Sequence, residues 1–206
     1  MKINIINNNH TTYHIVHSVN STEAERYACM ELQKYLYLST NTLIPVFSDK
    51  CMKRSKEIII GSARDSQVSL ELAGMSKEAF IIKEKDEEIY ITGNSPRGIL
   101  YGVYKFLEEF INFRCFTKDC EKYDSIDNLS IDKDFSLIQD FTFEYREVYF
   151  TDAFNGDFAA KNMLNSNLAD LSSKHGNKVK WYNFHHSFSD LINPKDYFDE
   201  HPEYFS

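Results

Sequence analysis

Strand-like and helix-like segments alternate along the first 110 residues of the chain. Residues 57–60 are a glutamate and three isoleucines followed by Gly61, and such an unbroken β-branched run predicts a strand buried on both faces. Ser95 and Pro96 open the clearest helix, with the serine as N-cap and the proline at the first helical position. Apolar residues then recur at helical spacing up to Phe110. This alternation predicts an α/β fold for the first half of the chain.

The other elements of the first half follow from the same kind of pattern. Thr22 and Glu25 form a capping box, which opens a predicted helix that continues to about Leu38. Two apolar runs separated by the charged residues 84–87 predict a hairpin. The predicted strands cover residues 3–6, 13–19, 43–47, 57–60, 78–83 and 88–92.

Two glycines lie four residues apart on the second predicted helix. Gly98 and Gly102 each cost a helix about 1 kcal/mol relative to alanine, and a close approach of the helix to a sheet would offset that cost. Residues 93–98 have the outline of a phosphate-binding loop. However, Ile99 and Leu100 stand where such a loop needs Lys and Ser or Thr, so nucleotide binding is not expected.

The chain is acidic and rich in aromatic residues. Lys and Arg number 23 against 31 Asp and Glu, and the resulting net charge of −8 disfavours non-specific binding to nucleic-acid phosphates. The 13 Tyr, 16 Phe and one Trp can fill a core and stack on ring-shaped ligands. No apolar run is long enough to span a membrane, and residues 1–9 lack the pattern of a signal peptide. We therefore expect no nucleic-acid or membrane partner, and a cytoplasmic location if Met1 is the natural start, otherwise export.

The four cysteines do not form a metal-binding pattern. Cys115 and Cys120 are close in sequence, but no second pair completes a zinc site. Ordinary thiols are the expected state, with a disulfide, or a reactive or metal-bound thiol, as alternatives. No metal and no cofactor is predicted.

The apolar periodicity of the sequence is lost after Thr117. Residues 117–140 contain acidic residues with little periodicity and are interpreted as a linker or an excursion between domains. Residues 141–150 alternate strongly and predict a strand, and 158–165 predict a short helix. The predicted division is therefore into residues 1–140 and 141–206.

Several short motifs resemble known families. Residues 24–36, 57–61 and 97–107 resemble the first helix, the central strand and the last helix of the small α/β domain that precedes the barrel in family 20 hexosaminidases and family 67 α-glucuronidases. An Arg-Gly-x-x-Tyr-Gly run, here residues 97–102, is the recurrent signature of that last helix. The C-terminal portion, above all residues 186–188, Pro194 and residues 197–205, is similar to a domain of unknown function found in bacterial carbohydrate-utilisation proteins.

The resemblance implies an α/β (α+β) architecture. Residues 1–140 are expected to be a non-catalytic domain with a small mixed sheet and helices on it. Residues 141–206 are expected to hold the first strand and following segments of a (β/α)8 barrel. Such a barrel needs about 250 residues, and 60 follow Arg146, so we expect an incomplete barrel and a fragment of a longer protein.

The same resemblance also indicates whether this chain can cleave glycosides. Glycoside cleavage usually needs two carboxyl groups that flank the scissile bond, or a substrate acetamide in place of one. In the related barrels these acids come from later strands, so no catalytic residue is assigned here and the chain is predicted not to hydrolyse glycosides.

Arg146 is the best single candidate for substrate binding. In the hexosaminidases that this segment resembles, an arginine on the first barrel strand hydrogen-bonds sugar hydroxyls, and a guanidinium suits that role because it offers five fixed donors. The alternative is a structural ion pair with Glu144 or Glu147.

Four further residues are weighed as substrate-binding candidates. His185 and His186 have aromatic neighbours and could contact sugar, make structural hydrogen bonds or bind metal. Asp152 and Asn162 follow the barrel-like strand, where active-site loops arise, although plain solvated polar groups are the simpler interpretation. Arg97 is interpreted as a structural residue of the helix N-terminus.

The leading hypothesis is the N-terminal part of a glycoside hydrolase-like protein of polysaccharide utilisation, with an oligo- or polysaccharide as partner of the whole protein. A non-enzymatic carbohydrate-binding or scaffolding module is the alternative. An unrelated α/β small-molecule binder is less well supported, because no phosphate loop or dinucleotide fingerprint is present.

Overall fold

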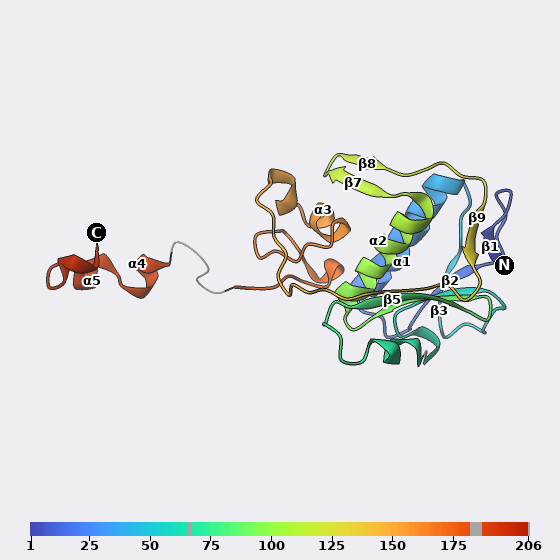
Figure 1. Ribbon diagram of the computed structural model, residues 1–206, viewed down its shortest axis with the longest axis horizontal. Coiled ribbons are helices and arrows are strands. Elements are labelled where there is room, and N and C mark those ends of the chain that lie inside the picture. The colour runs from blue at the N-terminus through green and yellow to red at the C-terminus, as the bar shows by residue number, and fades with distance from the viewer. Residues whose placement is uncertain (66, 182–186, 206) are drawn as a thin grey trace.

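The computed structural model describes residues 1–65, 67–181 and 187–205, and its centre is a six-stranded mixed sheet (Figure 1). The strands lie in the order β10-β5-β6-β4-β2-β3, and β3, β2, β4 and β6 run parallel while β5 and β10 are antiparallel to their neighbours. Their bounds are β2 His14–His17, β3 Val46–Ser48, β4 Glu57–Ile60, β5 Phe80–Lys85, β6 Glu88–Gly93 and β10 Ser136–Gln139. The mixed sheet confirms the predicted fold class.

Two long helices cover one face of this sheet. Figure 1 shows α1 (Glu23–Thr40) and α2 (Pro96–Ile111) packed side by side on it, and two 3₁₀ helices, Ala63–Asp65 and Gln67–Leu72, on the opposite side. The predicted caps are present: Thr22 and Glu25 form the capping box of α1, and Ser95 caps α2.

Strand β4 is buried on both faces, as its sequence predicts. All four of its residues are buried. Ile58 and Ile60 belong to the large core under the helices, whereas Ile59 packs with Val16 and Ala63 on the opposite side of the sheet. Layers on both faces therefore account for the unbroken apolar run.

The two helix glycines mark the place where α2 approaches the sheet. A Cβ on Gly98 would lie 2.9 Å from the carbonyl oxygen of Glu78, and one on Gly102 would lie 3.0 Å from the Cγ2 of Ile91. The close-approach interpretation is thus correct for both positions.

Residues 117–140 are not a linker. They contribute β8 (Cys120–Lys122), which pairs with β7 (Arg114–Thr117), and β9 (Leu129–Asp132), which pairs with β1 (Lys2–Ile6). They also contribute β10 at the edge of the main sheet. Each of these strands is only three or four residues long, which is too short for its alternation to stand out among charged neighbours.

The predicted strand at 141–150 is wrong. No strand is assigned there, because no neighbouring strand lies along this segment in the described part of the chain. The backbone N–H of Arg146 instead donates to the side chain of Asn165 over 2.8 Å, and the backbone N–H of Asn165 donates to the carbonyl of Arg146.

Short helices make up most of the remaining regular structure. The predicted helix at 158–165 begins and ends earlier, as α3 (Gly156–Lys161). The others are the 3₁₀ helices Thr151–Phe154, Ser173–His175 and Pro202–Tyr204, together with α4 (Phe188–Leu191) and α5 (Pro194–Tyr197). In the described residues no closed barrel is present, and none of the described helices is long and apolar enough to cross a membrane.

Candidate functional site

A buried charge cluster forms around Glu78, where the α/β fold meets the segment that follows it. Glu78 directly precedes β5, and Arg97 lies in the first turn of α2. Because Gly98 has no side chain, the helix start comes close to the Glu78 backbone, and this places the Arg97 side chain beside the Glu78 carboxylate.

Both carboxylate oxygens of Glu78 are engaged. The Oε1 of Glu78 forms an ion pair with Arg97, at 2.5 Å from its Nε, although the N–H of that nitrogen is not directed at the oxygen. The same Oε1 accepts a 2.9 Å hydrogen bond from the Nδ2 of Asn165. Oε2 accepts a hydrogen bond from the Nη2 of Arg146. The side chains of Glu78, Arg97 and Arg146 are only 7%, 14% and 17% exposed. One buried carboxylate thus neutralises part of the charge of two guanidinium groups.

Arg146 is held by the protein through all three of its side-chain nitrogens. Besides Glu78, it donates from Nε to the carbonyl of Met163 and from Nη1 to the carbonyl of Phe143, each over 2.8 Å. Its guanidinium also lies 4.0 Å from the centre of the Phe141 ring. The ion-pair alternative for Arg146 therefore named the wrong carboxylates, Glu144 and Glu147, because the partner is Glu78.

The Arg-Gly-x-x-Tyr-Gly signature connects the helix to the later segment. The Nη1 of Arg97 donates to the carbonyl of Asn177 over 2.8 Å, and the hydroxyl of Tyr101 donates to the carbonyl of Leu164 over 2.9 Å. Gly176, with a φ of +77°, fits against Arg97, where a Cβ would meet the arginine at 2.7 Å. Arg97 thus has the structural role predicted for it, and one of its partners, Asn177, lies 80 residues away in the sequence.

The other predicted binding residues do not join this cluster. The Asp152 carboxylate accepts from the Lys118 backbone N–H over 3.1 Å, and Asn162 donates to the carbonyls of Cys115 and Phe158 over 3.2 and 3.0 Å. Both residues therefore contact the β7–β8 region. His185 and His186 lie outside the described residues.

Sequence reasoning missed Glu78 and Asn165. The Glu78–Arg146 contact spans 68 residues and the Glu78–Asn165 contact spans 87, so no local spacing links these side chains. The available signal was an acidic residue at the start of a predicted buried strand, which needs a partner when it is buried.

A second polar cluster joins α1 to the segment after α3. The Asp157 carboxylate accepts from Tyr27, His175 and Lys174 over 3.0, 2.8 and 2.8 Å. Burial raises the pKa of Asp157, but these donors outweigh it and hold that pKa well below its usual range. The backbone N–H of Ser172 donates to the Nδ1 of His175, so the single ring proton resides on Nε2 and faces Asp157.

This arrangement predicts that acid destabilises the protein. Burial lowers the pKa of His175 below its usual 6.5 despite the neighbouring Asp157. The unfolded chain therefore binds a proton more readily than the folded chain, and stability falls as the pH drops below about 6.5, by up to about 1.4 kcal/mol per pH unit. Melting temperatures of wild type and His175→Gln at pH 7.5 and 5.5 measure this effect. We expect a smaller acid-induced decrease in His175→Gln, while a control variant at the exposed His10, His10→Gln, behaves like wild type. Equal decreases in all three proteins would contradict the prediction.

All four cysteines are free thiols, and burial raises the pKa of Cys115 to about 11. Among residues 1–65, 67–181 and 187–205, no group of three or more His, Cys, Asp or Glu side chains is arranged to hold a metal ion.

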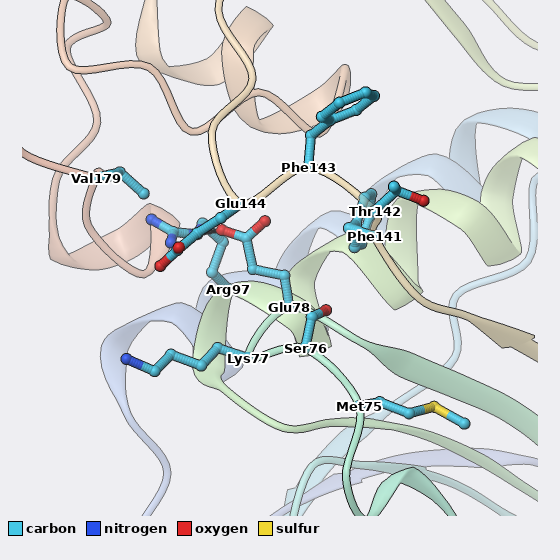
Figure 2. A pocket seen from close by; sticks show the side chains of 10 residues that line it. All are labelled: Met75, Ser76, Lys77, Glu78, Arg97, Phe141, Thr142, Phe143, Glu144 and Val179. Carbon is cyan, nitrogen blue, oxygen red and sulfur yellow. Dashed lines mark ion pairs between the residues drawn. The ribbon is translucent and has the colours of Figure 1, made fainter.

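A pocket of about 430 Å³ opens beside the Glu78 cluster. Figure 2 shows Glu78 and Arg97 pointing toward one another at its centre, Lys77 and Met75 at the lower rim, and Phe143 above. Its wall comes from both sides of the junction, namely Met75, Ser76, Lys77, Glu78 and Arg97 on one side and Phe141, Thr142, Phe143, Glu144 and Val179 on the other.

Two family models match this chain, one on each side of residues 107–114. Residues 5–106 match the family model described as glycosyl hydrolase family 67 N-terminus, and residues 115–206 match the model of a domain of unknown function, DUF4838. Both resemblances drawn from the sequence are thereby confirmed, and the chain begins with a glycoside hydrolase-like N-terminal domain. A comparison with curated proteins finds no match.

Several solved structures are similar to this chain. One is a family 115 4-O-methyl-α-glucuronidase with specificity for decorated arabinogalactans, at 15% identity and a TM-score of 0.44, covering 70% of this chain and 19% of the other. Another is a chitobiase of Flavobacterium johnsoniae, at 14% identity and a TM-score of 0.37, covering 71% and 20%. A family 138 enzyme targeting pectin rhamnogalacturonan II matches at 19% identity and a TM-score of 0.32, covering 47% and 10%. The chain thus spans about a fifth or less of the length of these proteins.

Proposed function

We propose that this chain is the non-catalytic N-terminal region of a glycoside hydrolase-like protein of polysaccharide utilisation. In this proposal residues 1–140 form the accessory α/β domain, and residues 141–206 carry the start of a barrel. The observation that carries the proposal is the Glu78 cluster, which joins the signature helix of the accessory domain to the segment at 141–181.

The contacts of the Glu78 carboxylate support a structural rather than a catalytic role. Each of its carboxylate oxygens already has a partner within the protein, so neither is free to donate a proton to a glycosidic oxygen or to attack a sugar carbon. The proposed contact of Arg146 with sugar in the whole protein stays a prediction, as do those of Asp152, Asn162, His185 and His186.

The segment after the accessory domain supports the barrel part of the proposal. Tyr149 and Phe150 are 67% and 48% exposed, although large aromatic side chains are usually buried in a finished fold. Packing against the remainder of a barrel would cover them. A carbohydrate-binding or scaffolding module without catalysis is the second candidate, since exposed aromatic rings also suit sugar stacking.

Turnover by the purified 206-residue chain tests the proposal. We expect no release of p-nitrophenol above the buffer blank from a panel of p-nitrophenyl glycosides that includes β-N-acetylglucosaminide, α- and β-glucosides, β-galactoside and β-xyloside. A mock purification from cells that do not express the chain serves as the control for contaminating enzymes. Turnover by the wild type that is clearly greater than in this control would overturn the non-catalytic assignment.

A further inference from the structure

We propose that the pocket beside the Glu78 cluster, between residues 75–78 and 141–144, is a binding site for a neutral sugar ring of a glycan. The proposal rests on the proposed function, because that function brings the protein into contact with carbohydrate. The location of the site rests on the geometry of the pocket.

The size and the apolar wall of the pocket suit a sugar. A volume of about 430 Å³ lies in the range of small-ligand sites. Two aromatic rings line it, but Phe141 is already occupied by the Arg146 guanidinium at 4.0 Å and by the Tyr101 ring at 5.9 Å. Phe143 is 73% exposed and thus offers an accessible apolar ring on which the C–H face of a sugar can stack.

The polar rim suits hydroxyl groups. Lys77 supplies an exposed donor and Glu144 an exposed acceptor, and neither side chain has an ion-pair partner among the described residues. Sugar hydroxyls both donate and accept, so they can use both groups.

The balance of charge selects a neutral ligand. Lys77 and Arg97 carry positive charge, and Glu78 and Glu144 carry negative charge, so the lining as a whole has no net charge. Since Arg97 is already paired with Glu78, it offers little attraction to a carboxylate or phosphate. A neutral hexose or pentose unit is therefore favoured over a uronic acid or a sugar phosphate.

Methionine-methyl NMR provides a direct test, because Met75 lines the pocket and the other four methionines of the chain do not. The labelled chain is titrated with cellobiose, β-1,4-galactobiose and xylobiose as neutral probes, and with glucuronate as an anionic probe. We expect a saturable shift of the Met75 methyl signal with at least one neutral disaccharide, with the Met1 and Met52 signals unchanged. Glucuronate should bind several-fold more weakly.

Two exposed phenylalanines give a matched pair of variants. Phe143→Ala should weaken binding about tenfold by removing the stacking ring, whereas Phe116→Ala, which removes a ring that is 58% exposed on β7, should leave it within about twofold. Because both rings are exposed, neither change should prevent folding.

The outcomes separate this proposal from the proposed function. No Met75 response up to about 50 mM of any probe, equal binding by Phe143→Ala and wild type, or tighter binding of glucuronate would each overturn the neutral-sugar site. Those results would leave the non-catalytic assignment intact, because that assignment is decided by the p-nitrophenyl glycoside assay.

Discussion

Replacement of Glu78 by alanine is expected to lower the free energy of unfolding by about 3 kcal/mol or more. The change leaves Arg97 and Arg146 without their shared carboxylate, and removal of one partner from a buried pair typically costs about 3–5 kcal/mol. It also leaves the Nδ2 of the fully buried Asn165 with one acceptor fewer. Urea unfolding at pH 7.5 measures the change.

Two variants show whether the loss at Glu78 comes from its charge. Glu78→Gln fills the same space, so a loss of about 2 kcal/mol there would report the missing charge rather than a cavity. Glu71→Ala removes a carboxylate whose ion pair with Lys83 is exposed, and it should cost less than about 1 kcal/mol. A Glu78→Ala protein as stable as Glu71→Ala would show that the buried cluster contributes no more to stability than an exposed ion pair does.

Gly98→Ala is expected to destabilise the protein by about 2 kcal/mol, although alanine is the better helix former by about 1 kcal/mol. The new methyl group would lie 2.9 Å from the carbonyl oxygen of Glu78 and 3.0 Å from that of Ala79. Both atoms belong to the backbone entering β5, so they can move only if the sheet and α2 separate. The free energy of unfolding in urea reports the effect.

Gly102→Ala provides the matched control on the same helix. Its methyl group would meet the side-chain Cγ2 of Ile91 at 3.0 Å, and a side chain can adjust more easily than a backbone carbonyl. We expect this variant to be at least about 1.5 kcal/mol more stable than Gly98→Ala. If the two substitutions had the same effect, close backbone approach at Gly98 would not explain the signature glycine.

The parts of the fold that depend on neighbouring residues could be predicted from the sequence. The capping box at Thr22, the Ser95 cap and the isoleucine run of β4 all depend on groups within a few residues of one another. The glycines of α2 were also interpreted correctly, since their cost implies a compensating contact.

The elements that were predicted wrongly depend on partners that are distant in the sequence. β9 pairs with β1 and β10 pairs with β5, so residues 117–140 become part of the fold through contacts that no local pattern shows. Residues 141–150 have the alternation of a strand, but a strand also needs a neighbour, and the backbone of Arg146 finds Asn165 instead.

The candidate site could also be predicted only in part, since one of its residues was identified but its partner was not. Arg146 was identified through the resemblance of its segment to the first barrel strand of hexosaminidases, with a structural ion pair as the alternative. The carboxylate that it contacts, Glu78, precedes it by 68 residues. Asp152 and Asn162 were chosen because they follow the predicted barrel strand, but both contact the β7–β8 region instead. Chemical type could thus be inferred from the sequence, whereas the arrangement in space could not.

A double-mutant cycle tests most directly whether the signature helix and the following segment are coupled through Glu78. The free energies of unfolding of wild type, Glu78→Ala, Arg146→Ala and the double variant are compared in urea. We predict that the double variant is more stable than the sum of the single effects by about 2 kcal/mol. Glu78→Ala leaves the Arg146 guanidinium without its carboxylate, and Arg146→Ala leaves the Oε2 of Glu78 without its donor. Additive effects to within about 0.5 kcal/mol would contradict the coupling.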